Sequence, residues 1–390
     1  MQDQYKYDQR GVSATKAEVH QAIKGMDKGL YPNAFCKILP DVVGGDDDFC
    51  NLMHADTAGT KTSLAYLYWR ETGDLDVWKG IAQDALVMNL DDMACVGCID
   101  DIVISSTIGR NKHLITGEVI ATIINAATKF RDDMAKFGIG LHLSGGETAD
   151  VGDIVRTLDV GYTTFARMEC AKVIKNEIQT GDVIVGLASY GQASYEDSYN
   201  GGMGSNGLTS ARHDVFTKAY LDKYPESCDP NTPEEVLYTG TKSLTDTIEI
   251  EGAQLTIGKL VLSPTRTYLP VIKNLLQALP TQINGMVHCT GGGQEKVQHV
   301  ISTKTRIKDN LLPIPPLFDL IQKESGTSWR EMYQVFNMGH RLEVYLPEAF
   351  AQKVVEIAQE FHIDAQVIGR VEAYDGEVVL IDSPYGKFEY

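Results

Sequence analysis

Glycine-rich loops that follow apolar, β-branched runs recur in both halves of this 390-residue chain, and they limit its fold more than any other feature. The expected strands lie at 49–55, 102–107, 140–143, 159–167 and 183–188, and the expected helices lie at 76–96 and 116–137. Alternating strands and helices are typical of an α/β (α+β) fold. We predict two α/β domains, residues 1–168 and 169–390, with a ligand cleft between them.

The charge of the chain argues against a polyanionic partner. Its formal net charge is -18, which does not favour nucleic acid or an anionic membrane surface. No run of 18 apolar residues suggests a membrane-spanning helix, and the first residues have no apolar core typical of a signal peptide. Seven scattered cysteines show no disulfide framework, so we expect a cytoplasmic protein with a structural Cys95/Cys98 pair.

Three acidic segments in the first half suggest a metal-bound nucleoside triphosphate. The segments are His54–Lys61, Leu90–Met93 and Ser144–Thr148. Mg²⁺ takes oxygen ligands such as carboxylates and phosphates, and glycines let backbone N–H groups approach a phosphate closely. The P-loop pattern G-x-x-x-x-G-K-[ST] is absent from the chain. The carboxylates of these segments, at Asp56, Asp91, Asp92 and Glu147, could meet a metal ion, and the residues of this half that could meet the nucleotide are Asp56, Gly59, Thr60, Lys61, Gly145 and Gly146.

Each acidic segment also has an ordinary structural interpretation. Asp56 could cap a helix whose exposed face carries Lys61, and Glu147 could belong to a simple turn. Asp91 and Asp92 are harder to explain in this way. Adjacent carboxylates near a helix C-terminus repel each other and oppose the helix dipole, a cost that a metal ion would offset.

The second half contributes two glycine-rich segments that could face the same ligand. Ser205-Asn206-Gly207 begins an expected helix, where it could act only as an N-cap. His288 precedes Thr290 and the loop Gly291–Gly293, which leads into an expected helix at 294–301. This is a typical anion-binding geometry, although a lone histidine in an apolar strand is often a core residue. Arg266 could pair with a phosphate or with a neighbouring carboxylate.

These motifs resemble, in order, those of the aminoimidazole ribonucleotide synthetase family, the phosphoribosylformylglycinamidine cyclo-ligases. The family patterns D-G-V-G-T-K, M-x-x-N-D-L, G-G-E-T-A, S-N-G, A-P-T-R-I-Y, H-L-T-G-G-G and E-M-Y-R-T-F-N-x-G are matched at 56–61, 88–93, 145–149, 205–207, 263–268, 288–293 and 331–339. The first three patterns are shared across an ATP-dependent superfamily that includes thiamine-monophosphate kinase. The last three point to the cyclo-ligase branch, most specifically the segment 331–339.

The resemblance implies a two-domain fold with ATP in the cleft between the domains, and a homodimer formed through strands of the N-terminal domain. It implies Mg²⁺ on Asp56, Asp92 and Glu147, with Lys61 on the phosphates. The implied reaction closes the imidazole ring of formylglycinamidine ribonucleotide in purine biosynthesis, with Lys61, Asp92 and His288 as catalytic residues. Asn206, Thr290, Gly291, Gly292 and Gly293 would contact the nucleotide or the substrate.

Two alternatives to the ring closure remain open at this point. The first-half motifs would serve a small-molecule kinase equally well, as in the thiamine-monophosphate branch. A non-catalytic nucleotide-binding protein is the third hypothesis, and the intact acidic motifs argue against it.

The chain departs from the family pattern at two places. The family usually reads P-H-S-N-G, but Gly204 stands where that histidine is expected, and His213 is a possible substitute. A further glycine usually follows F-N-x-G, but here His340 and Arg341 follow. The segment 189–203 is also longer than usual, and we expect it to form a lid.

Overall fold

The first half of the chain folds into one five-stranded sheet with helices on one side. The computed structural model describes residues 6–13, 17–300, 304–373 and 379–390. The strand order is β1-β2-β5-β3-β4, in which only β3 and β4 run parallel. The elements are α1 (Lys6–Gln9), α2 (Ala17–Ile23), β1 (Ile38–Pro40), β2 (Phe49–Thr57), α3 (Lys61–Thr72), α4 (Val77–Ala94), β3 (Ile102–Arg110), α5 (Gly117–Ala135), β4 (Leu141–Asp150) and β5 (Leu158–Glu169).

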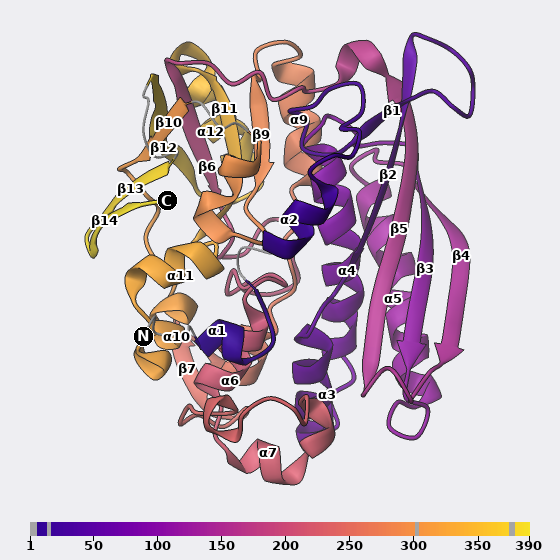
Figure 1. Cartoon of the computed structure of the whole chain (residues 1–390), viewed down its shortest axis with the longest axis vertical. Coiled ribbons are helices and arrows are strands. Elements are labelled where there is room, and N and C mark those ends of the chain that lie inside the picture. Colours follow the sequence, from indigo (N-terminus) through magenta and orange to yellow (C-terminus); the bar gives the residue numbers. More distant parts are fainter. Residues whose placement is uncertain (1–5, 14–16, 301–303, 374–378) are drawn as a thin grey trace.

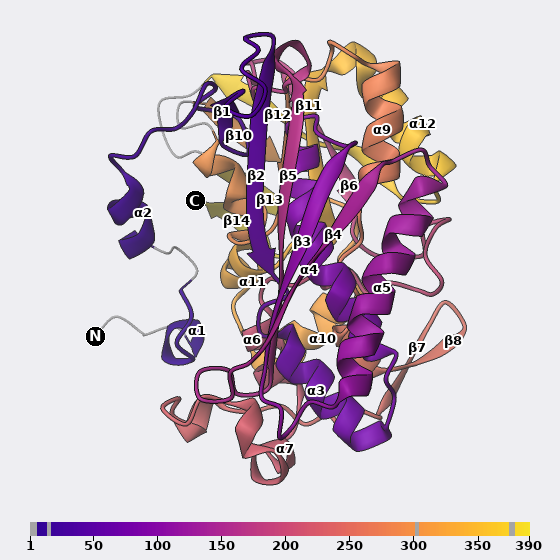
Figure 2. The same cartoon turned by 90° about the vertical axis from the view of Figure 1, so that its right-hand side faces the viewer.

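Only one face of this sheet is covered. Helix α4 packs on β2 and β5, and α5 packs on β4. Figure 2 looks onto the other face, where no helix covers the strands. Met53 and Val103 point to this open face and are 63% and 40% exposed. Since alternate residues of a strand point to opposite faces, residues of β2 such as His54 and Asp56 lie on the helix side.

The second half forms a seven-stranded sheet of order β14-β13-β10-β12-β6-β11-β9. The strands are β6 (Asp182–Ala188), β9 (Gly285–His288), β10 (Lys304–Lys308), β11 (His340–Pro347), β12 (Ala365–Ala373), β13 (Val379–Ser383) and β14 (Gly386–Glu389), and β7 (Thr247–Ile250) pairs with β8 (Ala253–Thr256) separately. The helices are α6 (Leu208–Val215), α7 (Ala219–Lys223), α8 (Ile257–Val261), α9 (Leu269–Ala278), α10 (Pro316–Ser325), α11 (Trp329–Val335) and α12 (Ala351–Glu360), with short 3₁₀ segments at Cys170–Lys172, Pro225–Ser227, Glu234–Val236, Gly293–His299 and Glu348–Phe350. No helix in the described parts of the chain is both long and apolar enough to span a membrane.

Helix α4 lies between the two sheets (Figure 1). Nearly all of its residues are buried, because it packs on β2 and β5 on one side and contacts α9 and β9 of the second half on the other. A helix in such a position must be apolar around most of its circumference. The carboxyl groups that α4 does carry at Asp84, Asp91 and Asp92 are therefore buried and need partners.

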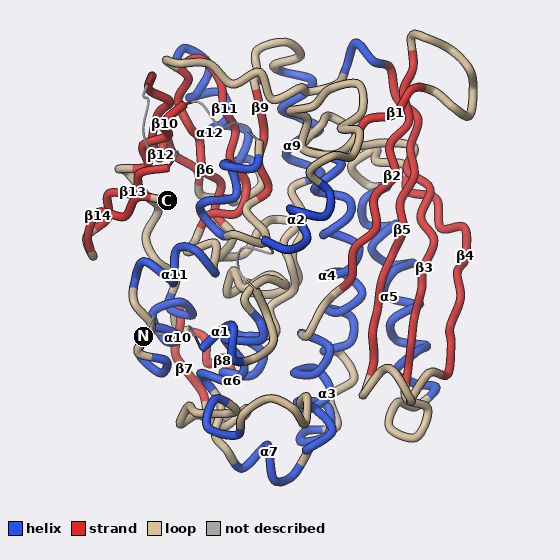
Figure 3. The backbone as a smooth tube through the Cα atoms, in the orientation of Figure 1, coloured by secondary structure: helices blue, strands red, loops and turns tan. Residues whose placement is uncertain are grey.

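Most of the expected elements are confirmed, with local corrections. The strands expected at 49–55, 102–107, 159–167 and 183–188 and both long helices are present (Figure 3). The turn expected at Gly145-Gly146-Glu147 is wrong, because these residues lie inside β4 at a register shift against β3. The segment after Gly292 is a 3₁₀ helix, Gly293–His299, and Ile301 lies outside the described residues.

Candidate active site

The acidic face of α4 fastens the two halves of the chain together. Asp84 Oδ1 accepts hydrogen bonds from Thr265 N and Oγ1, both at 2.7 Å. Asp91 accepts from Thr267 Oγ1 at 2.7 Å and from Tyr268 N at 2.8 Å. Asp91 therefore has a structural role, and its proximity to Asp92 needs no metal ion to explain it.

Asp92 heads a buried chain of polar side chains that reaches the second sheet. Its Oδ1 lies 2.7 Å from His288 Nδ1, at the end of β9. Arg341 Nε donates to His288 Nε2 at 2.9 Å. A guanidinium can only donate, so His288 Nε2 is the acceptor and His288 Nδ1 carries the proton that is donated to Asp92. The structure thus brings together Asp92 and His288, two of the residues singled out from the sequence.

The protonation states follow from burial and from this hydrogen-bond chain. Burial lowers the pKa of His288 to about 4, helped by the charge of Arg341, so the imidazole is neutral near pH 7. Burial is the largest single influence and acts to raise the pKa of Asp92, but the hydrogen bond from His288 and nearby positive charge, including that of Lys296, together outweigh it, so the pKa is lowered. The pair therefore consists of an ionised carboxylate and a neutral histidine.

His54 connects Asp92 to the Asp56 motif. Asn89 donates to the carbonyls of Ala85 and Asp56, at 2.9 and 3.3 Å, so its Oδ1 faces His54 Nδ1 at 3.0 Å. In the neutral histidine, Nδ1 then carries the hydrogen and Nε2 is an acceptor. This Nε2 faces Asp92 Oδ2 at 3.5 Å. Two acceptors facing each other require a shared cation or proton, so the residues fit a metal ion at this point.

Glu147 lies on a different part of the first sheet. Its register partner on β3 is Thr107, which pairs with Gly161 of β5, which in turn pairs with Thr57 of β2. Three strand spacings of about 4.8 Å place Glu147 about 14 Å from the Asp56 motif. The row that contains Glu147 faces the open side of the sheet, with Thr57 and Thr107 exposed. Within one chain, Glu147 therefore cannot share an ion with Asp56 and Asp92, and Gly145 and Gly146 lie on β4 with it.

Lys61 points into the protein. Its side chain is fully buried, and its Nζ donates to Asp84 Oδ1 at 2.9 Å and to the carbonyls of Gly204 and Ser263 at 3.1 and 2.5 Å. All three donors of the ammonium group are thus used. The expectation that Lys61 faces a phosphate site is corrected, because in this structure it joins α3 to loops of the second half. The neighbouring Gly59 and Thr60 remain exposed.

The glycine-rich loops of the second half are packed against each other and against the segment 331–339. A Cβ on Gly291 would lie 3.6 Å from Asn206 Nδ2. Asn206 Oδ1 is buried and has no hydrogen-bond partner among the described residues. Thr290 is 4% exposed, and the carbonyl of Tyr333 lies only 2.6 Å from the position of a Cβ on Gly293. The unpartnered Asn206 oxygen is suited to accept a hydrogen bond from a bound ligand.

Asn337 gives the segment 331–339 a structural role. Its Oδ1 accepts from Ser189 Oγ at 2.8 Å, and its Nδ2 donates to the carbonyl of Gly202 at 2.8 Å. It therefore holds both ends of the loop between β6 and α6. His213, the possible substitute for the missing histidine, is buried and stacks edge-on against Tyr238, so it belongs to the core behind α6.

The segment 189–203 is anchored to the protein body. Arg266 donates to Glu196 Oε2 at 2.5 Å and to the carbonyls of Ala188, Tyr190 and Gly191 at 2.7–3.0 Å. Arg266 is 1% exposed. The question left open for Arg266 is thus settled in favour of a carboxylate partner. These contacts do not favour the expected lid.

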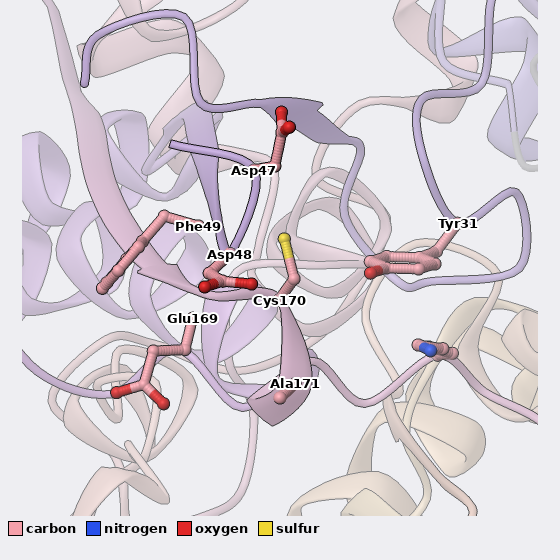
Figure 4. A pocket seen from close by; sticks show the side chains of 8 residues that line it. Tyr31, Asp47, Asp48, Phe49, Glu169, Cys170 and Ala171 are labelled. Carbon is pink, nitrogen blue, oxygen red and sulfur yellow. The ribbon is translucent and has the colours of Figure 1, made fainter. Parts of the chain in front are cut away.

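A hollow of about 530 Å³ lies at the other end of β2 and β5 (Figure 4). It is lined by Tyr31, Asp47, Asp48, Phe49, Glu169, Cys170, Ala171 and Lys175. Phe49 begins β2 and Glu169 ends β5, so the hollow is separated from Asp56 by the length of the strand. None of the residues singled out from the sequence lines it.

Three residues of the site were missed by the sequence analysis. His54 could have been found, because it alternates with Asp56 on one face of a strand. Helical spacing does place Asp84 two turns before Asp91 and Asp92 on α4, but it gave Asp84 no role in the site. Arg341 gave no signal beyond its departure from the family pattern, since only the tertiary structure brings it to His288.

Both halves of the chain are similar to known proteins. Family models described as "AIR synthase related protein", N-terminal and C-terminal domain, match residues 37–168 and 179–382. A phosphoribosylformylglycinamidine cyclo-ligase of Methanocaldococcus jannaschii is 27% identical over 83% of this chain and 79% of its own length. Its counterpart from Methanococcus vannielii is 26% identical over 94% of this chain and 89% of its own.

The fold is also found among solved structures. AaThiL complexed with AMPPCP and TMP superposes with a TM-score of 0.53 at 11% identity, covering 96% of each chain. At this identity the likeness concerns the fold alone. Since the two family models together span most of the sequence, the chain belongs to the AIR synthase related family.

Proposed function

We propose that this chain is a ligase that converts formylglycinamidine ribonucleotide into aminoimidazole ribonucleotide, using ATP, in purine biosynthesis. The observation that carries the proposal is the junction at Asp92, where His54 from β2 and His288 from β9 meet one carboxylate. The acidic motif of one half thereby meets the glycine-rich loops of the other. Relatives named for this reaction, which match 83% and 94% of the chain, support the assignment.

The residues fit ATP and Mg²⁺ as the groups that drive the reaction. When bound, ATP supplies the phosphoryl group that makes the amide oxygen of the substrate a leaving group, and Mg²⁺ offsets the charge. Asp56 and Asp92 offer the carboxylate oxygens that Mg²⁺ prefers. The neutral His288 holds the Asp92 carboxylate by a hydrogen bond, and His54 Nε2, 3.5 Å from the other carboxylate oxygen, would share a cation or a proton with it. The solved complex of AaThiL with AMPPCP supports a nucleotide site in this fold.

The remaining predicted site residues receive separate roles. Gly59 and Thr60 next to Asp56, together with Asn206, Thr290 and Gly291–Gly293, would bind phosphate groups through backbone N–H, amide and hydroxyl donors. Such binding brings the amine of the substrate to its own amide carbon, and ring closure then depends mainly on proximity. Glu147, with Gly145 and Gly146, would bind a second ion, with other ligands supplied from outside this part of the chain.

We further propose a homodimer that works in the cytoplasm. The open face of the first sheet, with Met53 and Val103 exposed, is the surface that a second copy would cover. The seven cysteines are all free, and Cys95 and Cys98 are buried thiols with a raised pKa, which suits a reducing compartment. Light scattering with the wild type and a Met53→Lys variant tests the dimer, since a lysine on that face is expected to weaken it.

The function is tested by incubating the purified protein with Mg-ATP and formylglycinamidine ribonucleotide. Aminoimidazole ribonucleotide is then detected as its coloured diazotised product, together with inorganic phosphate. We expect one product per phosphate released. Phosphate transferred to an acceptor molecule, with no aminoimidazole ribonucleotide, would contradict the proposal and favour the kinase.

Replacing the carboxylate at the junction is the sharpest test of the metal assignment. Asp92→Asn keeps the shape of the side chain but removes the charge that a cation needs. We expect Mg-dependent ATP binding, measured by calorimetry, to weaken at least tenfold. Asp133→Asn, an exposed carboxylate on α5, is the matched control and is expected to bind ATP normally. Equal affinities in the two variants would contradict the role of Asp92.

A further inference from the structure

Gly204 and Arg341 lie closer together than any residue other than glycine would allow. Gly204 has φ +67°, and a Cβ placed on it would lie 1.3 Å from Arg341 Nη1 and 2.4 Å from Arg341 Cζ. The guanidinium thus occupies the volume in which a side chain of residue 204 would lie. The carbonyl of Gly204 is held in place by Lys61 Nζ at 3.1 Å.

A β-bulge delivers Arg341 to this position. Against β6, His340 pairs with Ala188 and Leu342 with Leu187, so Arg341 is the extra residue of β11 at the register shift. A bulge redirects the side chain of its extra residue. Here the side chain enters the space between α4, Gly204 and the end of β9, where it is 1% exposed.

The contacts of Arg341 are unusual for a buried cation. Nε donates to His288 Nε2 at 2.9 Å, and Nη2 lies 3.4 Å from Met88 Sδ. No carboxylate oxygen of the described residues lies within 4.0 Å of its nitrogens, whereas the buried Arg266 is paired with Glu196. Burying a guanidinium without a bonded carboxylate costs stability. The packing of the core therefore does not by itself explain why an arginine lies here. Within the described parts of the chain, the one polar side chain to which it bonds is His288, and this bond makes His288 Nε2 an acceptor.

From these contacts we propose that Arg341 is a positioning residue that, together with Asp92, fixes the tautomer and the ring orientation of His288, and that Gly204 is required because the guanidinium fills the space beside it. With Nε2 used as an acceptor, the proton of His288 is confined to Nδ1 and is directed at Asp92. The unit Gly204–Arg341–His288 thereby orients the carboxylate at the junction of the two halves. Of the three measurements that test this proposal, only the activity measurement depends on the proposed function.

The tautomer is read directly by nuclear magnetic resonance. In protein labelled with ¹⁵N-histidine at pH 7.5, His288→Gln assigns the signal of His288. We expect the wild type to show the Nδ1–H tautomer alone. Arg341→Met leaves Nε2 without its donor and is expected to shift the Nε2 resonance, whereas Arg341→Lys, which can also donate to Nε2, is expected to restore at least part of the original pattern. Arg266→Met, which removes another buried guanidinium, is the control and is expected to leave the signal unchanged.

The shared volume is tested by a double-mutant cycle. Gly204→Ala is expected to lower the melting temperature strongly, since its Cβ collides with Arg341. In the Arg341→Ala background the same substitution is expected to lower it by less than half as much, because only the backbone strain at positive φ remains. Equal losses in the two backgrounds, or an unchanged His288 signal in Arg341→Met, would overturn the proposal.

Activity adds a third readout that separates this inference from the proposed function. If the chain closes the imidazole ring, Arg341→Met is expected to lower kcat at least tenfold and to leave the KM for ATP within twofold. An unchanged kcat would overturn the positioning role. If the wild type has no such activity, the proposed function fails, while the tautomer and the double-mutant cycle still decide the present inference.

Discussion

Asp91 is the residue of the acidic face whose ionisation is least favourable. Burial raises its pKa to about 7, although hydrogen bonds from Thr267 and Tyr268 oppose the rise. A carboxyl group with a raised folded-state pKa contributes most to stability when it is protonated. That contribution is fully present below the unfolded pKa near 4 and is lost as the pH rises through 7.

Asp91→Asn is therefore expected to stabilise the protein at high pH. An asparagine can accept from Tyr268 N and donate to Thr267 Oγ1, and it has no charge to bury. A shift of about three pKa units corresponds to an upper limit of about 4 kcal/mol in the free energy of unfolding, gained between pH 4 and pH 8. Urea titrations at the two pH values measure it. A gain of the same size at both would contradict the ionisation argument.

Among the secondary-structure elements, the C-terminal end of α11 packs directly against the glycine-rich loop Gly291–Gly293. Carbonyls of residues 333, 334 and 336 lie within 3.0 Å of the position of a Cβ on Gly293, whereas a Cβ on Gly292 would have no neighbour closer than 3.8 Å. Both glycines have positive φ, 49° and 92°. Both positions therefore need a backbone conformation that favours glycine, but only Gly293 is closely packed.

This difference predicts unequal effects of two neighbouring substitutions. Gly292→Ala is expected to cost about 1 kcal/mol of stability, the usual strain of a non-glycine residue at positive φ. Gly293→Ala is expected to cost at least about 2 kcal/mol more, because carbonyl oxygens at the C-terminal end of α11 must move. Thermal unfolding measures both variants. Equal losses would mean that the loop is not supported by α11.

At the scale of the molecule, Lys61 joins the two halves through one buried ammonium group. It donates to Asp84 on α4 and to two carbonyls of the second half. Removing one member of a buried ion pair leaves an uncompensated charge, which lowers the free energy of unfolding by roughly 3–5 kcal/mol. The halves are therefore expected to unfold together in one transition.

Lys61→Met is expected to destabilise the whole molecule by about 3 kcal/mol or more. The double variant Lys61→Met/Asp84→Asn is expected to recover at least half of that loss, because no charge stays buried alone. Lys129→Met, which breaks an exposed pair with Asp133, is the control and is expected to cost less than about 1 kcal/mol. A double variant as unstable as the single one would contradict the charge argument.

Local sequence patterns were sufficient to predict part of the secondary structure and some of the candidate site residues. Period-two and helical spacing depend on residues close in the chain, so β2, α4, α5 and β5 could be predicted with nearly correct bounds. Asp92 and His288 could be singled out for the same reason, since each belongs to a short local motif. The turn at Gly145–Glu147 was wrong because glycines in a strand with a register shift resemble a turn locally.

Long-range packing decided what these residues do. Asp56 and Glu147 have similar motifs, but strand order places them about 14 Å apart on opposite faces. Lys61 has the sequence context of a phosphate ligand, but the burial of α4 gives its ammonium group another partner. The departures at Gly204 and Arg341 are 137 residues apart in the chain and form one contact in space. Local patterns were enough to predict the family, the motifs and several of the elements. Which polar groups meet depends on the folded chain, because hydrogen bonds and ion pairs require distances that local patterns do not contain.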